Sequence, residues 1–394
     1  MEAVRIHREG DKIRKTSFEK AILTQLVAFD SKFNYEVNLE NIASIGEKEI
    51  VKNKHLENFK ILLQKTEYFK NSHPFFKQFS KFIYDSEYSE KNSDKIIVIQ
   101  SQIDLSKILS KAKLSENEKF LENFNSSKEK SILDLINEKV DIIVSFDSCG
   151  VHSARFNFNL NLIETPKIIE ITDSTCNLIE AFFSDLKKDL VDKRIINEDI
   201  LSNHMIYSVI STTKAHFNPF EKKRDILGIS WKNKDYETVN DNILEQITKK
   251  DVAIHKGDIL TVTPQAALMV IPDLKDELYN DYVEERINAI EIFWRQKLLL
   301  KKMNFELDDL FSKVKELKGK NKLNSAIKRI QIMQITIESE LEVYRNTIIS
   351  VTDSFSMLFD TLNEVFKTKD HYNFVQEKLK AAKSIYENLN EERR

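Results

Sequence analysis

The C-terminal third of the sequence is almost free of helix-breaking residues. The last of the five prolines in the whole chain is Pro272. After Gly257 the only glycine is Gly319. Proline removes a backbone donor and clashes with the preceding turn, and glycine adds conformational freedom, so both weaken the interior of a helix. Residues 273–394 are therefore predicted to form long helices, an architecture different from that of the rest of the chain.

Apolar residues in this region follow a helical repeat. They recur at steps of three and four, at Leu323, Ala326, Ile330, Met333, Ile337, Leu341, Tyr344, Ile348, Val351, Phe355, Leu358, Leu362 and Val365. The spacing is close to a coiled-coil heptad, and Gly319 can take the positive φ of a helix end. We therefore expect one helix over 273–318 and a second over 323–365, joined as a long antiparallel coiled-coil hairpin, with a helical tail near 371–389.

Other apolar residues lie off the main seam of the predicted hairpin. They include Phe293, Leu299, Ile332, Ile335 and Phe359. A helix with a second apolar face needs a second partner, which is the tail helix, the N-terminal part of the chain or another subunit. The leading functional hypothesis is an interaction or regulatory protein, in which this hairpin mediates homo-oligomerisation or binds a protein partner.

The residues before 273 are expected to form two further regions. Residues 1–140 are predicted to be mainly helical, including 17–29, with one strand at 95–101. Residues 141–272 are predicted to be an α+β domain with a mostly antiparallel sheet, because the connections between its elements are short. Its predicted strands are 142–146, 154–163, 167–172, 205–212, 225–231 and 259–263, with helices near 175–192 and 236–250.

Composition excludes several classes of protein. The net charge is −3, so the chain as a whole has no electrostatic attraction to nucleic acid. Two cysteines, Cys149 and Cys176, are too few for a disulfide-built secreted domain. The charged N-terminus does not resemble a signal peptide, and no apolar run is long enough to span a membrane, so a cytoplasmic location is expected. None of the six glycines has Rossmann or P-loop spacing.

The stretch SFDSCGVHSARF, residues 145–156, concentrates reactive side chains. Its simplest interpretation is a turn between two strands, because Asp, Ser and Gly suit turn backbone angles. One alternative is a thiolate–imidazole pair formed by Cys149 and His152. Another is a zinc site that adds Cys176 and His204, although only the first pair has ligand-like spacing.

A third alternative rests on acidic residues in this part of the chain. A predicted strand ends in Asp147, a turn and further strands follow, and a predicted helix then carries Glu180. This order resembles the opening of an RNase H-like fold. The resemblance implies a nuclease in which the two acids hold Mg²⁺ or Mn²⁺. The sequence departs from that pattern at MIYSVISTTKAHF, which ends near His216 where a further acid would be needed. No other cofactor is expected.

Positive charge gathers at the predicted hairpin tip. The basic residues there are Lys313, Lys315, Lys318, Lys320, Lys322, Lys328 and Arg329, against Glu316 alone between them. In a nearly neutral chain, such a cluster is a candidate contact for nucleic acid or for an acidic face of a protein partner. The alternative is a solvated tip that keeps the helices soluble.

Overall fold

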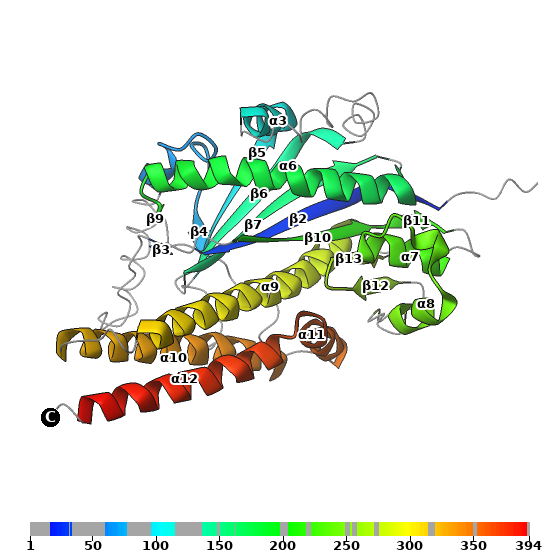
Figure 1. Ribbon diagram of the computed structural model, residues 1–394. Coiled ribbons are helices and arrows are strands. Elements are labelled where there is room, and N and C mark those ends of the chain that lie inside the picture. Colours follow the sequence, from blue (N-terminus) through cyan, green and yellow to red (C-terminus); the bar gives the residue numbers. More distant parts are fainter. Residues whose placement is uncertain are drawn as a thin grey trace, which may run out of the picture.

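The computed structural model describes residues 16–30, 32–33, 60–76, 96–114, 136–147, 150–161, 163–197, 204–217, 222–248, 253, 258–271, 276–313, 320–349 and 353–391. These residues form a mixed α and β protein with a large sheet and long C-terminal helices (Figure 1). That combination confirms the fold class at its broad level. Within these ranges no helix combines the length and apolar character needed to cross a membrane.

The main sheet has eight strands in the order β12-β13-β10-β2-β7-β6-β5-β4. Neighbouring strands run antiparallel, except β10 and β13, which are parallel. The mostly antiparallel sheet is thus as predicted. Its strands are β2 (Ala21–Asp30), β4 (Phe75–Phe76), β5 (Ile96–Asp104), β6 (Ile136–Asp147), β7 (Val151–Leu160), β10 (His204–Thr212), β12 (Ile259–Val262) and β13 (Ala266–Val270).

Two smaller sheets complete the β structure. One has the strand order β11-β1-β8 and the other pairs β3 with β9. Their strands are β1 (Ser17–Glu19), β3 (Lys32–Phe33), β8 (Ile163–Glu164), β9 (Ile196–Asn197) and β11 (Lys214–His216).

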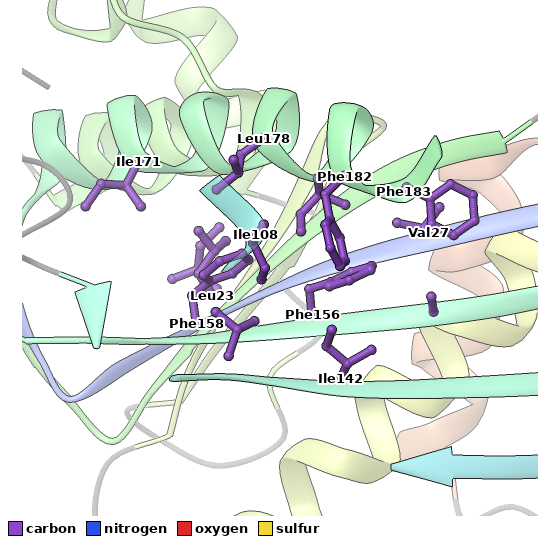
Figure 2. Close-up of a cluster of buried hydrophobic side chains, with 14 of the residues drawn as sticks. Leu23, Val27, Ile108, Ile142, Phe156, Phe158, Ile171, Leu178, Phe182 and Phe183 are labelled. Carbon is purple, nitrogen blue, oxygen red and sulfur yellow. The ribbon is translucent and has the colours of Figure 1, made fainter. Parts of the chain in front are cut away.

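Helices cover both faces of the main sheet (Figure 1). On one face lies α6 (Thr165–Asp192), and Figure 2 shows Phe156 of β7 pointing towards Phe182 of this helix, with ring centroids 6.0 Å apart. On the other face lies α9 (Asp276–Lys313). Alternate side chains of β2 point to opposite faces of the sheet. Val27 therefore packs in the hydrophobic core between the sheet and α6, and Leu26 packs in the core between the sheet and α9.

Shorter helical segments also belong to the sheet region. They include α3 (Leu105–Leu114), α7 (Lys222–Trp231), the 3₁₀ helix η2 (Tyr236–Thr238) and α8 (Asp241–Thr248). α3 packs on α6, and α7 contacts α6, η2, α8 and the edge strands β12 and β13.

Three helices follow α9. They are α10 (Lys320–Ile349), α11 (Asp353–Phe366) and α12 (Thr368–Glu391), and α12 agrees with the tail helix predicted near 371–389. α12 lies alongside both α9 and α10 (Figure 1). Its Tyr386 hydroxyl donates to the Leu310 carbonyl at 2.9 Å, and its Lys378 ammonium donates to Asp308 at 2.6 Å.

The prediction of a mainly helical region over 1–140 is wrong for its described part. Residues 17–29 form β1 and β2 instead of a helix, and β5 and the first part of β6 also precede residue 141. β2 lies in the middle of the main sheet. It is covered on both faces, so almost every position is apolar and the alternation that marks a half-buried strand is lost.

Two predicted strands are helical in the structure. Residues 167–172 belong to α6, where Pro166 stands at the start of the helix. Residues 225–231 belong to α7, whose central residues are buried. A short apolar run without a polar face has no helical periodicity, so its sequence cannot separate a buried strand from a buried helix.

The coiled-coil hairpin is not confirmed, although its long helices are present. α9 packs more extensively against α12 than against α10, and the helix predicted over 323–365 is divided between α10 and α11. The extra apolar residues Phe293, Leu299 and Phe359 are buried within the chain, between the sheet, α9 and the C-terminal helices. These three side chains therefore give no reason to invoke another subunit.

Candidate functional site

In the stretch 145–156, the described residues form the end of β6, a bend at Gly150 and the start of β7. The strands pair antiparallel, with Ser145 opposite Ser153, and Gly150 takes a φ of 81° that suits glycine. This arrangement agrees with the simplest interpretation of the sequence, a turn between two strands. Cys149 falls outside the described residues, so the thiolate–imidazole pair stays a prediction.

His152 and His204 occupy different environments. The ring of His152 is fully buried and lies against Phe29 and Phe146, with ring centroids 5.2 and 5.5 Å away. His204 is partly exposed, and its Nε2 atom lies 3.4 Å from an oxygen of Glu180. Among the residues that the structure describes, no group of three or more His, Cys, Asp and Glu side chains is arranged to hold a metal ion.

The structure places Asp147 and Glu180 on different elements. Glu180 lies on α6 next to the first residue of β10, and its side chain is 62% exposed. Asp147 ends β6, and the strand order places β6 three positions from β10. Neighbouring strands lie about 4.8 Å apart, so the backbone of Asp147 is roughly 14 Å from that of β10. The side chain of Asp147 lies outside the described part of the structure, so a metal site shared by Asp147 and Glu180 stays a prediction.

A buried polar network joins β7 to α9. Arg155 is 3% exposed and Glu291 is 1% exposed. Arg155 donates from Nε to Glu291 at 2.8 Å and from Nη1 to Glu284 at 2.8 Å, and Nη2 donates to Glu291 and Asn288. Ser153 also donates to Glu291. Burial opposes the charge on Arg155, but the two carboxylates outweigh it and raise its pKa.

This network is a feature that the sequence analysis missed. Arg155 follows the strand turn and Glu291 lies in the middle of a long helix, more than a hundred residues later. Its partners are protein side chains, of which Glu291 is buried and Glu284 is half exposed, and they satisfy the guanidinium within the fold. The arrangement therefore links α9 to the sheet through a buried ion pair.

The basic tip carries less free charge than its sequence indicates. Lys313 pairs with Asp309 at 2.7 Å, and Arg329 pairs with Glu306 at 3.3 Å. Glu306 and Asp309 lie upstream on α9, and the return of the chain along α10 brings Arg329 next to them. A count of acids between Lys313 and Arg329 omits both, because it considers sequence neighbours and not spatial ones.

The other predicted tip residues are less fully described. Lys315 and Lys318 lie outside the described residues. Lys320 and Lys322 belong to the first turn of α10, but their side chains are not described. Lys328 lies further along α10 and is exposed.

The outer face of α10 carries two exposed apolar residues. Ile332 is 52% exposed and Ile335 is 65% exposed. They lie three residues apart, one turn beyond Lys328, so all three share one side of the helix. The opposite side of α10 packs into the molecule through buried residues such as Met333.

A cleft lies on a different part of the molecule. Its volume is about 740 Å³, within the range typical of small-molecule sites. One wall comes from Trp231 at the end of α7 and Pro264 between β12 and β13. The other wall comes from α11 and the start of α12, with the charged residues Asp360, Glu364, Lys367, Lys369 and Asp370.

Comparisons of this chain with protein-family models, with curated proteins and with solved structures gave no match.

Proposed function

We propose that this chain is an interaction protein that self-associates through the outer face of α10. The observation that carries the proposal is the exposure of Ile332 and Ile335, at 52% and 65%. Large apolar side chains that project side by side from a helix commonly mark a contact surface. The other three residues that the sequence places off the hairpin seam are buried, so these two are the part of that set still available to a partner.

Charge complementarity supports a second copy of the chain as the partner. Along the exposed face of α10, Lys328 precedes the two isoleucines and Glu338 follows them, and both charged side chains are exposed. In an antiparallel pair of α10 helices centred on the isoleucines, Lys328 of each copy would lie near Glu338 of the other. Such a surface is self-complementary, as a two-fold symmetric dimer requires.

The magnitude of the expected contact follows from the exposed area. Each isoleucine has about half of its surface still to bury, which contributes about 1 kcal/mol. A symmetric pair buries the two isoleucines of both copies, so together they contribute roughly 4 kcal/mol. Loss of that contribution would raise the dimer dissociation constant about a thousandfold.

Sedimentation velocity over a range of protein concentrations tests the proposal. We expect the wild-type chain to form dimers in the micromolar range, and the double variant Ile332→Ser/Ile335→Ser to be monomeric. Serine has a helix propensity near that of isoleucine, so α10 should persist. Ile243→Ser is the matched control, because Ile243 is 48% exposed on α8 and should not affect association.

Charge exchange tests the antiparallel arrangement. Lys328→Glu and Glu338→Lys should each weaken the dimer by up to about tenfold, and the double exchange should restore it, because it recreates both pairs with opposite signs. In a parallel dimer like residues would face each other, and the double exchange would restore nothing. A wild-type chain that stays monomeric throughout the micromolar range contradicts the proposal, as does a dimer that survives the loss of both isoleucines.

A further inference from the structure

The cleft between α7 and the α11–α12 junction has an electrostatic division that is independent of the surface on α10. Its α11 side carries Asp360 and Glu364, within the last two turns of that helix. The C-terminal end of a helix has a partial negative charge from its terminal carbonyl groups. This side of the cleft therefore favours a cationic group.

The α12 side of the cleft favours an anionic group. α12 begins at Thr368, and Lys367 and Lys369 line the cleft on either side of that residue. The first amides of a helix carry a partial positive charge, which adds to that of the two ammonium groups. Asp370 lies in the same first turn, so the cleft as a whole has one more carboxylate than ammonium group.

The junction between the two helices is held in a defined conformation. Lys367 has a φ of 54°, and the Thr368 hydroxyl donates to the Asn363 side chain at 2.6 Å. The helix ends that carry opposite partial charges are thus fixed next to each other.

An aromatic surface faces these charges from the opposite wall. Trp231, the last residue of α7, lines the cleft and is 38% exposed. An indole face attracts cations and stacks well with the planar guanidinium group. Trp231, Asp360 and Glu364 together suit a guanidinium or ammonium group on an aliphatic chain, whereas Lys367 and Lys369 suit a carboxylate.

We propose that this cleft binds an arginine- or lysine-type ligand with a free carboxylate. Such a ligand has a side-chain cation, a carboxylate and a net positive charge in its free form, which matches the single excess negative charge of the cleft. Two sources share this chemistry, a free basic amino acid and the C-terminal basic residue of a peptide. The volume of about 740 Å³ accommodates either one.

Calorimetric titration of the full-length chain with L-arginine is the direct test. L-citrulline keeps the shape and the carboxylate but lacks the side-chain charge, and agmatine keeps the guanidinium but lacks the carboxylate. We expect each to bind about fivefold more weakly than arginine, the effect of one partly exposed ion pair. Titration with glycyl-arginine separates the sources, since a peptide site binds it at least as tightly as arginine and a free amino-acid site binds it more weakly.

Variants assign each end of the ligand to its side of the cleft. Asp360→Asn should weaken arginine about fivefold and leave citrulline unchanged, whereas Lys369→Gln should weaken arginine and leave agmatine unchanged. Glu387→Gln is the matched control, because Glu387 is exposed near the far end of α12. Arginine binding also has an optical readout, because Trp231 lines the cleft while Trp294, the other tryptophan, is 6% exposed.

Two results would overturn the proposal. One is the absence of heat and of any fluorescence change with millimolar arginine and with glycyl-arginine. The other is binding of arginine that neither Asp360→Asn nor Lys369→Gln alters, which would place the ligand elsewhere on the molecule.

Discussion

Replacement of Glu291 by glutamine should destabilise the fold strongly, because it leaves a buried guanidinium without its main counter-charge. Removal of one partner from a buried ion pair typically costs about 3–5 kcal/mol. Arg155 keeps a second carboxylate, Glu284, but that side chain is 49% exposed and compensates weakly. We therefore expect a loss near the lower limit, about 3 kcal/mol.

Urea unfolding monitored by tryptophan emission measures this loss. Trp294 lies one turn beyond Glu291 on α9, and its indole donates to the Met205 carbonyl on β10 at 2.9 Å, so it reports on the contact between helix and sheet. With an m-value of about 3 kcal/mol/M, the Glu291→Gln midpoint should fall by about 1 M urea. Glu284→Gln is the control and should cost about 1 kcal/mol or less.

The double variant Arg155→Met/Glu291→Leu tests whether Arg155 and Glu291 affect the stability of the fold as a coupled pair or independently of each other. Apolar residues of similar volume often replace a buried ion pair without loss of stability, so this variant should lie within about 1 kcal/mol of the wild type. The reasoning is refuted if Glu291→Gln is no more destabilising than Glu284→Gln. The reasoning is also refuted if the stability lost in the double variant equals the sum of the losses in Arg155→Met and in Glu291→Leu measured separately.

Further predictions concern two buried residues, Gly228 and Gln25, and the partly buried Cys176. Gly228→Ala would place a Cβ atom 2.6 Å from Cγ of Tyr236, and should cost about 2 kcal/mol in thermal unfolding; an unchanged melting temperature would contradict this. Gln25→Leu removes bonds from a fully buried amide and should cost about 1–3 kcal/mol in urea unfolding, so wild-type stability would speak against its role. Burial raises the pKa of the Cys176 thiol, so in a Cys149→Ser background its alkylation should need a higher pH in the folded chain than in the urea-unfolded chain. Since the folded pKa is the higher one, the contribution of this thiol to stability is complete below the unfolded pKa and is lost as the pH rises through the folded pKa; equal pH profiles of alkylation for the folded and unfolded chains would contradict the shift.

The parts of the fold that the sequence predicts are those with a regular pattern. The absence of proline after Pro272, with Gly319 as the only later glycine, indicates long helices, and α9, α10 and α12 agree with it. The alternation in β7 likewise identifies a strand. The sequence predicts a helix where β2 lies and a strand where α7 lies. Both predictions are wrong because burial on several sides removes the polar positions that would reveal a helical or strand period.

The arrangement of elements is harder to predict than their existence. A heptad pattern shows that a helix has an apolar seam, but it does not identify the helix that fills it, and on α9 that helix is largely α12. The same limit applies to the sites. Asp147 lies on β6 and Glu180 lies on α6 beside β10, three strands from β6, although the two residues are close in the sequence. Trp231 and Lys369 are distant in the sequence but line one cleft.

The central position of β2 has a consequence for synthesis of the protein. β2 pairs with β7 on one side and with β10 on the other, with Ala21 opposite Leu160 and Ile22 opposite Ser211. At ribosomal rates of roughly 5–20 residues per second, β7 is completed about ten seconds after β2, and β10 several seconds later. During that interval the segment AILTQLVAF has no neighbouring strand, and its apolar side chains are available to chaperones and to other nascent chains. The strand in the middle of the sheet is made early and can join it only after most of the other strands have left the ribosome.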